Sequence, residues 1–445
     1  MRRSHHTAVC LAALLPALAA AQPAPPAVDA AVRRDVVDSI AERLRRYYAD
    51  ADTGRLIAEH LERRARGGAF DTLTNAMRFS DALTRELQAV NGDRHLYVRY
   101  APDAPGMRPG PEGIRMLGPD RAEPPVSPAA LDAARRMHWG IGRLDVLPGN
   151  VGYMDVRGFV DGRATQEAIV AALRYLDGTD AMIVDLRRNG GGSAETVNFL
   201  LSHFTTADTV ASLRVTNRSG RETFTRYTLA RVPGPRRPDV PLYVLTSGLS
   251  ASAAEDFAFV SHNLGRATLV GATTAGAGRN NALLDVGHGF GASISFSRVQ
   301  DPRTGREWER VGVAPDVVVD QSRALETAQA LALDKLAARE ADPRRKQLLG
   351  LLRETVLAQA EPRAVGAALL AEYAGEYQGG RAVTLDGGRL LWSPRPGAPP
   401  EPLVPLSDST FAMGANRIAF ERDGGRVARV RLTSPNDAVT FARLR

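Results

Sequence analysis

Short apolar runs that alternate with amphipathic stretches are the feature that most constrains the fold of this chain. Residues 181–186 and 241–245 are too short for buried helices, whereas residues 165–176 place apolar side chains at helical spacing. Strands that alternate with helices indicate crossover connections and a layered α/β sheet. Such sheets carry their chemistry in the loops at the carboxyl ends of strands. The expected strands are 152–156, 181–186, 241–245 and 267–270, and the expected helices are 165–176, 195–203 and 253–264.

The regions on either side of this alternation have different patterns. Residues 32–90 repeat apolar side chains at three- and four-residue steps, which predicts helices, and residues 101–128 are rich in Pro and Gly, which predicts a linker. After residue 368, short strands alternate with Asp-Gly-Gly turns. The predicted organisation is a signal peptide (1–21), an N-terminal helical domain with a linker (22–140), a catalytic α/β core (141–321), a helical segment (322–364) and a small β-rich domain (365–445).

The first 21 residues have the pattern of a secretory signal peptide. Arg2 and Arg3 supply the positive start, an apolar run follows, and residues 19–21 (Ala-Ala-Ala) provide a cleavage site. The run is too short to span a bilayer, although an uncleaved membrane anchor is the alternative. We therefore expect an exported protein, periplasmic or secreted, with no stable membrane insertion after cleavage. The only cysteine, Cys10, lies in this segment, so the mature chain has no disulfide, thiolate nucleophile or four-cysteine zinc site.

The charge pattern argues against nucleic-acid binding. The chain has 57 Lys and Arg against 50 Asp and Glu, a formal net charge of +7. The basic residues are scattered among acids, without the clusters or interleaved aromatic residues typical of a nucleic-acid interface. The histidines and acids show no ligand spacing such as His-Glu-x-x-His, so no metal or cofactor is expected.

A glycine triplet follows the first buried strand. The segment from Asp185 to Gly192 reads Asp-Leu-Arg-Arg-Asn-Gly-Gly-Gly and leads into a predicted helix. Glycine lets backbone N–H groups approach a ligand, and the positive end of the helix adds to this, so the turn could hold an oxyanion or a phosphate. The Lys-Ser/Thr ending of a phosphate-binding loop is absent, which disfavours a nucleotide. A plain tight turn is the alternative.

A second loop of small residues delivers serines to the start of a helix. Residues 245–255 read Leu-Thr-Ser-Gly-Leu-Ser-Ala-Ser-Ala-Ala-Glu. A serine hydroxyl at this strand-to-helix turn is expected to be exposed at the end of the sheet, where the next N–H can join an oxyanion hole, as at other nucleophile sites of this kind. Ser252 and Glu255 also have the spacing of a capping box, and from the local pattern alone this structural role is the commoner explanation.

A serine nucleophile needs a base. Lys335 and Lys346 are the only lysines, and both lie beyond the α/β region, so a histidine is the expected base. His95 stands in a polar turn, Asn-Gly-Asp-Arg-His, that leads into a strand. The alternative is a structural histidine, which is the commoner role of a lone histidine.

Four ordered segments of the chain resemble the tail-specific, or C-terminal processing, serine peptidase family, which includes the tricorn core protease and retinol-binding repeat domains. Each segment is weakly specific by itself, but their order and spacing together are specific. The resemblance implies a crotonase-like α/β core with a mixed sheet, a peptide or protein substrate, and cleavage through a serine nucleophile. The four segments are Asp185–Gly192, Pro241–Glu255, Gly265–Gly278 and Trp308–Asp316.

The resemblance assigns the nucleophile and the oxyanion hole. It implies that Ser252 attacks the scissile carbonyl and that the N–H groups of Gly191 and Ala253 bind the tetrahedral oxyanion. Many members insert a peptide-binding PDZ module before the core, but residues 101–145 are too few and too rich in Pro and Gly for one. Two other functions on this fold are alternatives: a non-catalytic ligand- or peptide-binding protein, and an esterase-type acyl hydrolase.

The resemblance also bears on the base. Bacterial processing members carry a lysine where this chain has Ala277, which agrees with the scarcity of lysine. The tricorn-like branch uses a histidine oriented by polar groups that include a glutamate, and the matching residues are His95 and Glu309. For Glu309 the alternative is a surface charge beside Trp308. The expected machinery is a serine assisted by His95, with Glu309 orienting the histidine.

Overall fold

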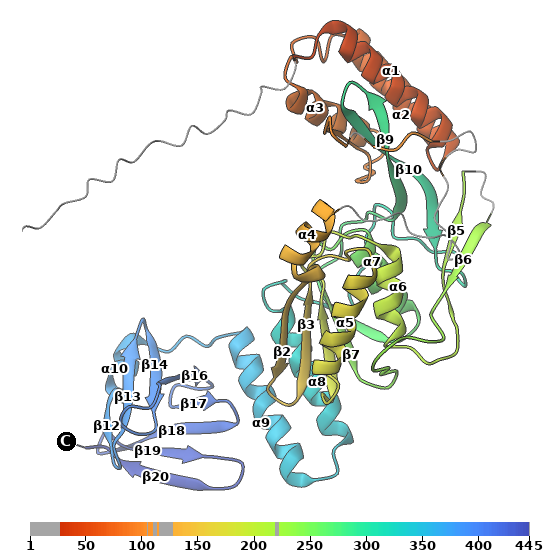
Figure 1. The fold of residues 1–445 in the computed structure, drawn as a ribbon. Coiled ribbons are helices and arrows are strands. Elements are labelled where there is room, and N and C mark those ends of the chain that lie inside the picture. The colour runs from red at the N-terminus through yellow and green to blue at the C-terminus, as the bar shows by residue number, and fades with distance from the viewer. Residues whose placement is uncertain (1–26, 105, 110–113, 115–127, 219–221, 445) are drawn as a thin grey trace, which may run out of the picture.

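The computed structural model describes residues 27–104, 106–109, 114, 128–218 and 222–444. The predicted signal peptide and most of the predicted linker lie outside these ranges. Within them, no helix is long and apolar enough to cross a membrane. Three bodies are visible in Figure 1: a lobe that contains the first helices, a central α/β core, and a β-rich body at the C-terminus.

The central core is a six-stranded mixed sheet with helices on both faces. Its strand order is β11-β8-β7-β4-β3-β2, in which β2 is antiparallel to β3 and the other neighbours are parallel. The strands and helices predicted here are confirmed to within two residues at each end; the crotonase-like class stays a prediction. The elements are α4 (Pro128–Arg136), η1 (His138–Gly140), β2 (Ile141–Leu147), β3 (Val151–Val156), α5 (Arg163–Tyr175), β4 (Ala181–Asp185), α6 (Ala194–Ser202), β7 (Leu242–Thr246), α7 (Ala253–Asn263), β8 (Ala267–Gly271), β11 (Val317–Val318), α8 (Ala324–Arg339) and α9 (Pro343–Ala360).

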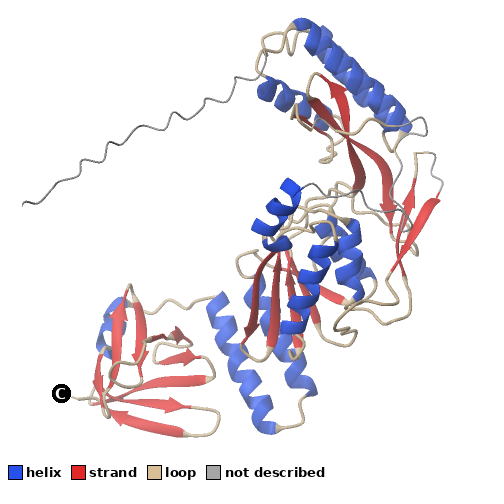
Figure 2. Cartoon of the chain, viewed as in Figure 1, coloured by secondary structure: helices blue, strands red, loops and turns tan. Residues whose placement is uncertain are grey.

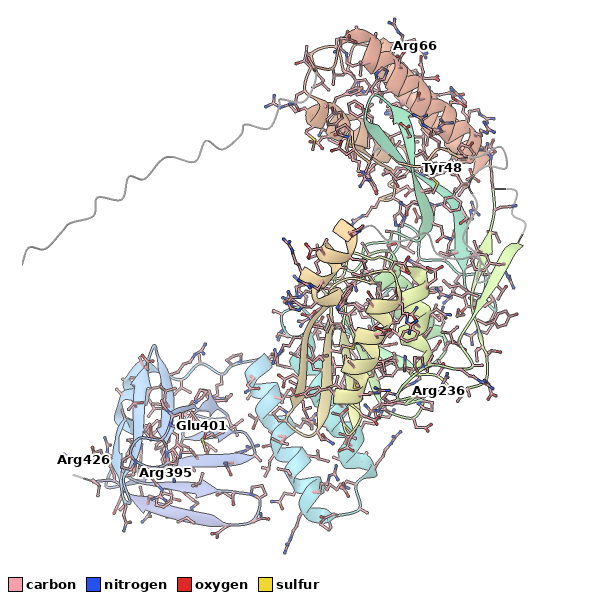
Figure 3. The ribbon with its side chains drawn as sticks, viewed as in Figure 1. Tyr48, Arg66, Arg236, Arg395, Glu401 and Arg426 are labelled. Carbon is pink, nitrogen blue, oxygen red and sulfur yellow. The ribbon has the colours of Figure 1, made fainter. Side chains whose placement is uncertain are left out.

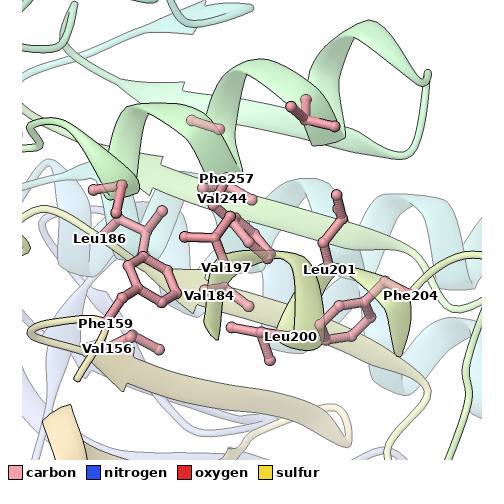
Figure 4. Packing of buried hydrophobic residues seen from close by; sticks show 14 of the residues in the cluster. Val156, Phe159, Val184, Leu186, Val197, Leu200, Leu201, Phe204, Val244 and Phe257 are labelled. Carbon is pink, nitrogen blue, oxygen red and sulfur yellow. The ribbon is translucent and has the colours of Figure 1, made fainter. Parts of the chain in front are cut away.

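Alternate residues of the buried strands face opposite helix layers. Met182 and Val184 pack with α5, α6 and α7, whereas Ala181 and Ile183 pack with α8 and α9. Burial on both faces explains why β4 is a continuous apolar run in the sequence. Figure 4 shows side chains of the first cluster, among them Val184 and Phe257, between the sheet and its helices. Because β4 and β7 are parallel neighbours, the loops that precede α6 and α7 meet at one edge of the sheet.

A second body, which we call the hairpin lobe, combines the first three helices with a long hairpin from later in the chain. Strand β10 pairs with β1 and β9, and its far end pairs with β5. The helices bury their apolar side chains in one cluster shared with β1, β9 and β10, so their burial depends on the hairpin (Figure 1). The elements are α1 (Ala30–Tyr47), α2 (Ala51–Arg66), α3 (Ala76–Ala89), β1 (Tyr97–Tyr100), β5 (Ala211–Thr216), β6 (Glu222–Tyr227), β9 (Arg279–Gly287) and β10 (Phe290–Gln300).

The C-terminal body consists mostly of strands, as its turn pattern predicted (Figure 2). Two antiparallel sheets, β12-β13-β14-β15 and β16-β17-β18-β19-β20, share an aromatic-rich core that includes Tyr373, Trp392 and Phe420. Arg417 ties this body to α9 by donating to the Leu351 carbonyl at 2.6 Å. The elements are α10 (Ala367–Tyr373), β12 (Gly375–Tyr377), β13 (Arg381–Asp386), β14 (Arg389–Ser393), β15 (Glu401–Pro402), β16 (Val404–Pro405), β17 (Thr410–Met413), β18 (Asn416–Asp423), β19 (Arg426–Thr433) and β20 (Ala438–Ala442).

Candidate active site

The loop between β7 and α7 has the geometry of a nucleophile elbow. Ser252 has φ 55° and ψ −116°, and such a conformation costs a non-glycine residue about 1–3 kcal/mol. It stands directly before the first residue of α7, where the positive end of the helix dipole favours developing negative charge. Its side chain lines a cavity of about 790 Å³. The strand, the sharp turn and the helix therefore present this serine to a ligand.

The neighbouring serines of this loop make structural bonds. Ser247 Oγ donates to the Arg187 carbonyl at 2.6 Å, and Ser250 Oγ donates to the Leu186 carbonyl at 2.7 Å. Both serines are fully buried. These bonds hold the elbow against the end of β4. Of the three serines in residues 247–252, Ser252 is the one that lines the cavity.

Glu255 holds the elbow against the loop after β8. It forms the predicted capping box with Ser252, in which Glu255 Oε2 accepts the Ser252 N–H at 2.8 Å. The same carboxylate accepts the Thr274 hydroxyl and the Gly276 N–H, both at 2.6 Å, and the Ala277 N–H at 2.8 Å. Glu255 is fully buried, and burial raises its pKa even though these donors oppose the rise. The structural role of this pair is confirmed, and it coexists with the cavity position of Ser252.

The glycine triplet lies against Ser252. A Cβ on Gly191, whose φ is 121°, would come within 2.9 Å of the Ser252 Cβ, so glycine is required here. The Gly191 N–H, which we predicted to be an oxyanion donor, donates to Asn189 Oδ1 at 2.9 Å in this structure. Among the described residues the Ala253 N–H has no hydrogen-bond partner, which is usual for the first N–H of a helix. An acceptor beside Ser252 would thus find one unpaired donor and one that is already engaged.

His95 and Glu309 come together in a separate buried cluster with Asp93. Each of the three residues offers one nitrogen or oxygen that lies within 4.8 Å of the others. Asp93 Oδ1 accepts the His95 backbone N–H, and Asp93 Oδ2 accepts the Tyr48 hydroxyl, both at 2.9 Å. Glu309 Oε2 accepts the Gly278 N–H at 2.8 Å. Asp93 and Tyr48 were not among the predicted site residues; the position of Asp93, two residues before His95, was the available signal.

Burial controls the protonation of this cluster. Burial lowers the pKa of His95, while the charge of Asp93 opposes this effect and Arg279 adds to it. Burial raises the pKa of Glu309 to about 7, and the charge of Asp93 adds to the rise. The Gly278 N–H and Arg279 lower the pKa of Glu309. Near neutral pH the imidazole is therefore uncharged, which is the form that accepts a proton.

The same three side chains could offer ligand atoms to a divalent cation. Arg279 Nε, however, lies 3.7 Å from Glu309 Oε1, and both residues are buried. A guanidinium at this distance repels a second cation. The charge arrangement therefore favours proton transfer over metal binding.

The structure does not join Ser252 to His95 directly. Among the described residues no hydrogen bond connects these two side chains, His95 does not line the Ser252 cavity, and the buried Nδ1 of His95 has no hydrogen-bond partner. The connection runs through two adjacent residues. The Ala277 N–H donates to the capping glutamate, and the next N–H, of Gly278, donates to Glu309.

The Ser252 cavity has a mainly apolar wall from both the core and the hairpin lobe. Polar groups on the wall include Arg226 and Asp256, which form an ion pair at 2.7 Å. The cavity volume of about 790 Å³ lies in the range of small-molecule and peptide sites. The apolar side chains on the wall include Phe159, Leu213, Val215, Phe224, Val299 and Trp308.

Two families match separate parts of this chain. Residues 150–319 match peptidase family S41, and residues 17–132 match the N-terminal domain of peptidase S41 in eukaryotic IRBP. The chain is similar to a carboxyl-terminal-processing protease of Synechocystis sp., with 32% identity over 181 residues that cover 40% of each protein. It is also similar to the carboxy-terminal processing protease CtpB of Bacillus subtilis, with 27% identity over 174 residues that cover 39% of this chain and 34% of the relative. The chain thus spans less than half the length of these relatives.

A solved structure, a lipoprotein from Streptococcus agalactiae, has 16% sequence identity and a TM-score of 0.46, over 68% of this chain and 96% of that chain. A likeness at this level says nothing about chemistry. The S41 match covers the elbow, the glycine triplet and Glu309, and the carboxyl-terminal-processing relatives agree with it. Residues 150–319 therefore match peptidase family S41, and part of the chain is similar to carboxyl-terminal-processing proteases.

Proposed function

We propose that this chain is a serine-type peptidase in which Ser252 attacks the carbonyl of a peptide bond. The observation that carries the proposal is the elbow: a strained serine before a helix, packed on a glycine that admits no side chain, at the wall of a large cavity. Strain of this kind is stored at functional sites. The match of residues 150–319 to peptidase family S41 supports peptide-bond hydrolysis as the reaction.

We assign the base to His95. Its uncharged imidazole takes the proton of the Ser252 hydroxyl as the Oγ–C bond forms, and returns it to the leaving amine when the C–N bond breaks. Glu309 orients the ring and stabilises the imidazolium. Because no hydrogen bond joins the two side chains here, the reaction requires His95 to approach Ser252 Oγ to about 3.2 Å or less.

The oxyanion hole is assigned to the N–H groups of Ala253 and Gly191. The Ala253 N–H follows the nucleophile at the start of α7, which is the usual place for one donor. The Gly191 N–H has to be shared with, or released from, Asn189 Oδ1 when substrate binds. One such donor contributes about 2.7–4 kcal/mol to the transition state.

The proposal extends to location and substrate. The signal-peptide pattern of residues 1–21 supports action outside the cytoplasm, in the periplasm or after secretion. The substrates are peptides or proteins, and hydrolysis by this machinery needs water and no cofactor. An esterase activity on acyl substrates would use the same groups.

Labelling with a fluorophosphonate tests the nucleophile. We expect the wild type to label and Ser252→Ala to lose both labelling and peptide cleavage, the latter by about 10⁴-fold or more. Ser193→Ala is the matched control, because Ser193 also lines the cavity; it should label like the wild type. Labelling of Ser252→Ala at the wild-type rate would overturn the assignment.

A non-catalytic binding protein is the second candidate. It is favoured by the observation that His95 lies outside the Ser252 cavity and makes no bond to the serine. This function predicts that the wild type neither labels nor cleaves, while apolar peptides bind in calorimetry. Affinity should then fall in Phe224→Ala, because Phe224 lines the cavity.

A further inference from the structure

Arg279 lies where the Ser252 cavity meets the buried histidine cluster. It is the first residue of β9, it lines the cavity together with Ser252, and it is only 9% exposed. Its Nε lies 3.7 Å from Glu309 Oε1, and its Cζ lies 5.6 Å from the centre of the Tyr48 ring. Figure 3 shows Tyr48 where the first helices meet the β9–β10 hairpin. Arg279 therefore contacts the His95 cluster and also lines the cavity that Ser252 lines.

The surroundings of Arg279 contain buried polar atoms without partners. Within the described part of the chain, Arg279 Nε and Nη1, His95 Nδ1 and Glu309 Oε1 have no hydrogen bond. An unpaired buried polar group is destabilising, so a cluster of such groups in a native fold calls for an explanation. The separation of 3.7 Å between Arg279 and Glu309 becomes a charge-assisted hydrogen bond after a small approach. The members of the cluster therefore lie close together, but the hydrogen bond between Arg279 and Glu309 is not formed.

Arg279 and Asp93 shift the pKa values of this site in opposite directions. Arg279 lowers the pKa of both His95 and Glu309, whereas Asp93 raises both. An uncharged imidazole beside an ionised carboxylate is the state that accepts a serine proton, so the positive charge of Arg279 favours the productive state. The titratable groups that act on the cluster from the surrounding elements are Tyr48, Asp50, Asp93, His95, Glu307 and Glu309.

We propose that Arg279 is a positioning residue of the peptidase, which holds Glu309 beside His95 and couples the hairpin lobe to the Ser252 cavity. The inference rests on the proposed function. Arg279 acts through Glu309 and Tyr48 and makes no bond to the reacting atoms. Lysine at this position keeps the charge but loses the planar group that lies over the Tyr48 ring and near the Glu309 carboxylate.

The test is the pH dependence of kcat and kcat/KM for the wild type, Arg279→Met and Arg279→Lys. We expect Arg279→Met to lower kcat by about 10- to 100-fold with little change in KM. Its acidic limb in kcat/KM should move up by about one pH unit, because losing the positive charge raises the pKa of the groups that must be deprotonated. Arg279→Lys should return the limb to the wild-type position and recover part of kcat.

Arg266→Met is the control for a merely structural role. Arg266 is a half-buried arginine whose guanidinium donates to the backbone carbonyls of Phe204, Arg237 and Val240. This variant should lower the melting temperature without moving the acidic limb, once fluorophosphonate titration has corrected for inactive protein. If Ser252 labels and the pH profile of Arg279→Met superimposes on that of the wild type, the role proposed for Arg279 is overturned. If the wild type does not label at Ser252, the proposed function fails as well.

Discussion

The two halves of the proposed machinery are built differently. Around Ser252, the capping carboxylate of Glu255 accepts hydrogen bonds from the backbone and from a threonine, and it is fully buried. Around His95, the buried Nδ1 and the facing Oε1 of Glu309 have no partner within the described residues. The half around Ser252 is held by hydrogen bonds before a substrate binds, whereas the half around His95 contains buried polar atoms that have no partner in the described part of the chain.

The difference follows from where each half is anchored. Ser252 lies in the loop between β7 and α7, and this loop is bonded to the end of the neighbouring strand β4 of the same sheet. His95 lies in the turn before β1 of the hairpin lobe, whereas Glu309 comes from the chain after β10. Contacts between two bodies respond to their relative movement, while short loops on one sheet do not. Under the proposed function, we therefore expect activation to depend on the approach of His95 and not on rearrangement of the elbow.

Glu255→Gln gives the largest expected effect, because it disrupts the hydrogen bonds that hold the loop of Ser252. The new amide group would direct N–H donors at groups that now donate to the carboxylate, such as the Ser252 and Ala277 N–H groups. We expect a loss of about 3–5 kcal/mol in the free energy of unfolding, measured by urea denaturation, and labelling of Ser252 slowed by about 100-fold.

The control for Glu255→Gln is Asp52→Asn, which removes an exposed acid from the first turn of α2. We expect it to change the free energy of unfolding by about 0.5 kcal/mol or less. If Glu255→Gln is as stable as this control and labels at the wild-type rate, the elbow is not held by the capping carboxylate.

Gly191→Ala has the next largest effect and tests the contact between the glycine triplet and the serine. The added Cβ meets the Ser252 Cβ at 2.9 Å, and φ of 121° is unfavourable for alanine. We expect a loss of about 2–4 kcal/mol in unfolding free energy and a slower labelling rate. Gly190→Ala is the matched control, because nothing lies within 4 Å of its Cβ position. Equal behaviour of the two variants would contradict the close packing of the triplet on Ser252.

The elbow could be predicted from the sequence because its signals are local. An apolar strand, a run of small residues and the Ser252–Glu255 spacing stand within a few positions of one another. The pairing of His95 with Glu309 came from family resemblance, since no local pattern connects residues so far apart. Arg279 and Tyr48 were missed because their meeting depends on how the hairpin packs against the first helices.

The hairpin itself also escaped prediction, although part of its signal was present. Residues 290–300 alternate small or apolar residues with serine, which is the period-two pattern of a strand. Ser293, Ser295 and Ser297 are nevertheless buried, so polarity did not indicate exposure here. Its partner β9 has a weaker alternation, and its register with β10 contains irregularities. The formation of β9, the strand that contains Arg279, therefore depends on tertiary pairing with β10.

Glu309→Gln has the smallest expected effect, and it tests the half of the site around His95. Burial raises the pKa of Glu309 from its ordinary value of 4.5 to about 7, so the folded state binds this proton more tightly than the unfolded state. The stability that this group contributes is present below pH 4.5 and is lost as the pH rises through about 7. Glutamine does not titrate, so the unfolding free energy of Glu309→Gln relative to the wild type should rise by about 1–3 kcal/mol between pH 5 and pH 8. Urea denaturation across this range measures the difference, and a flat difference would mean that Glu309 is paired as closely as Glu255.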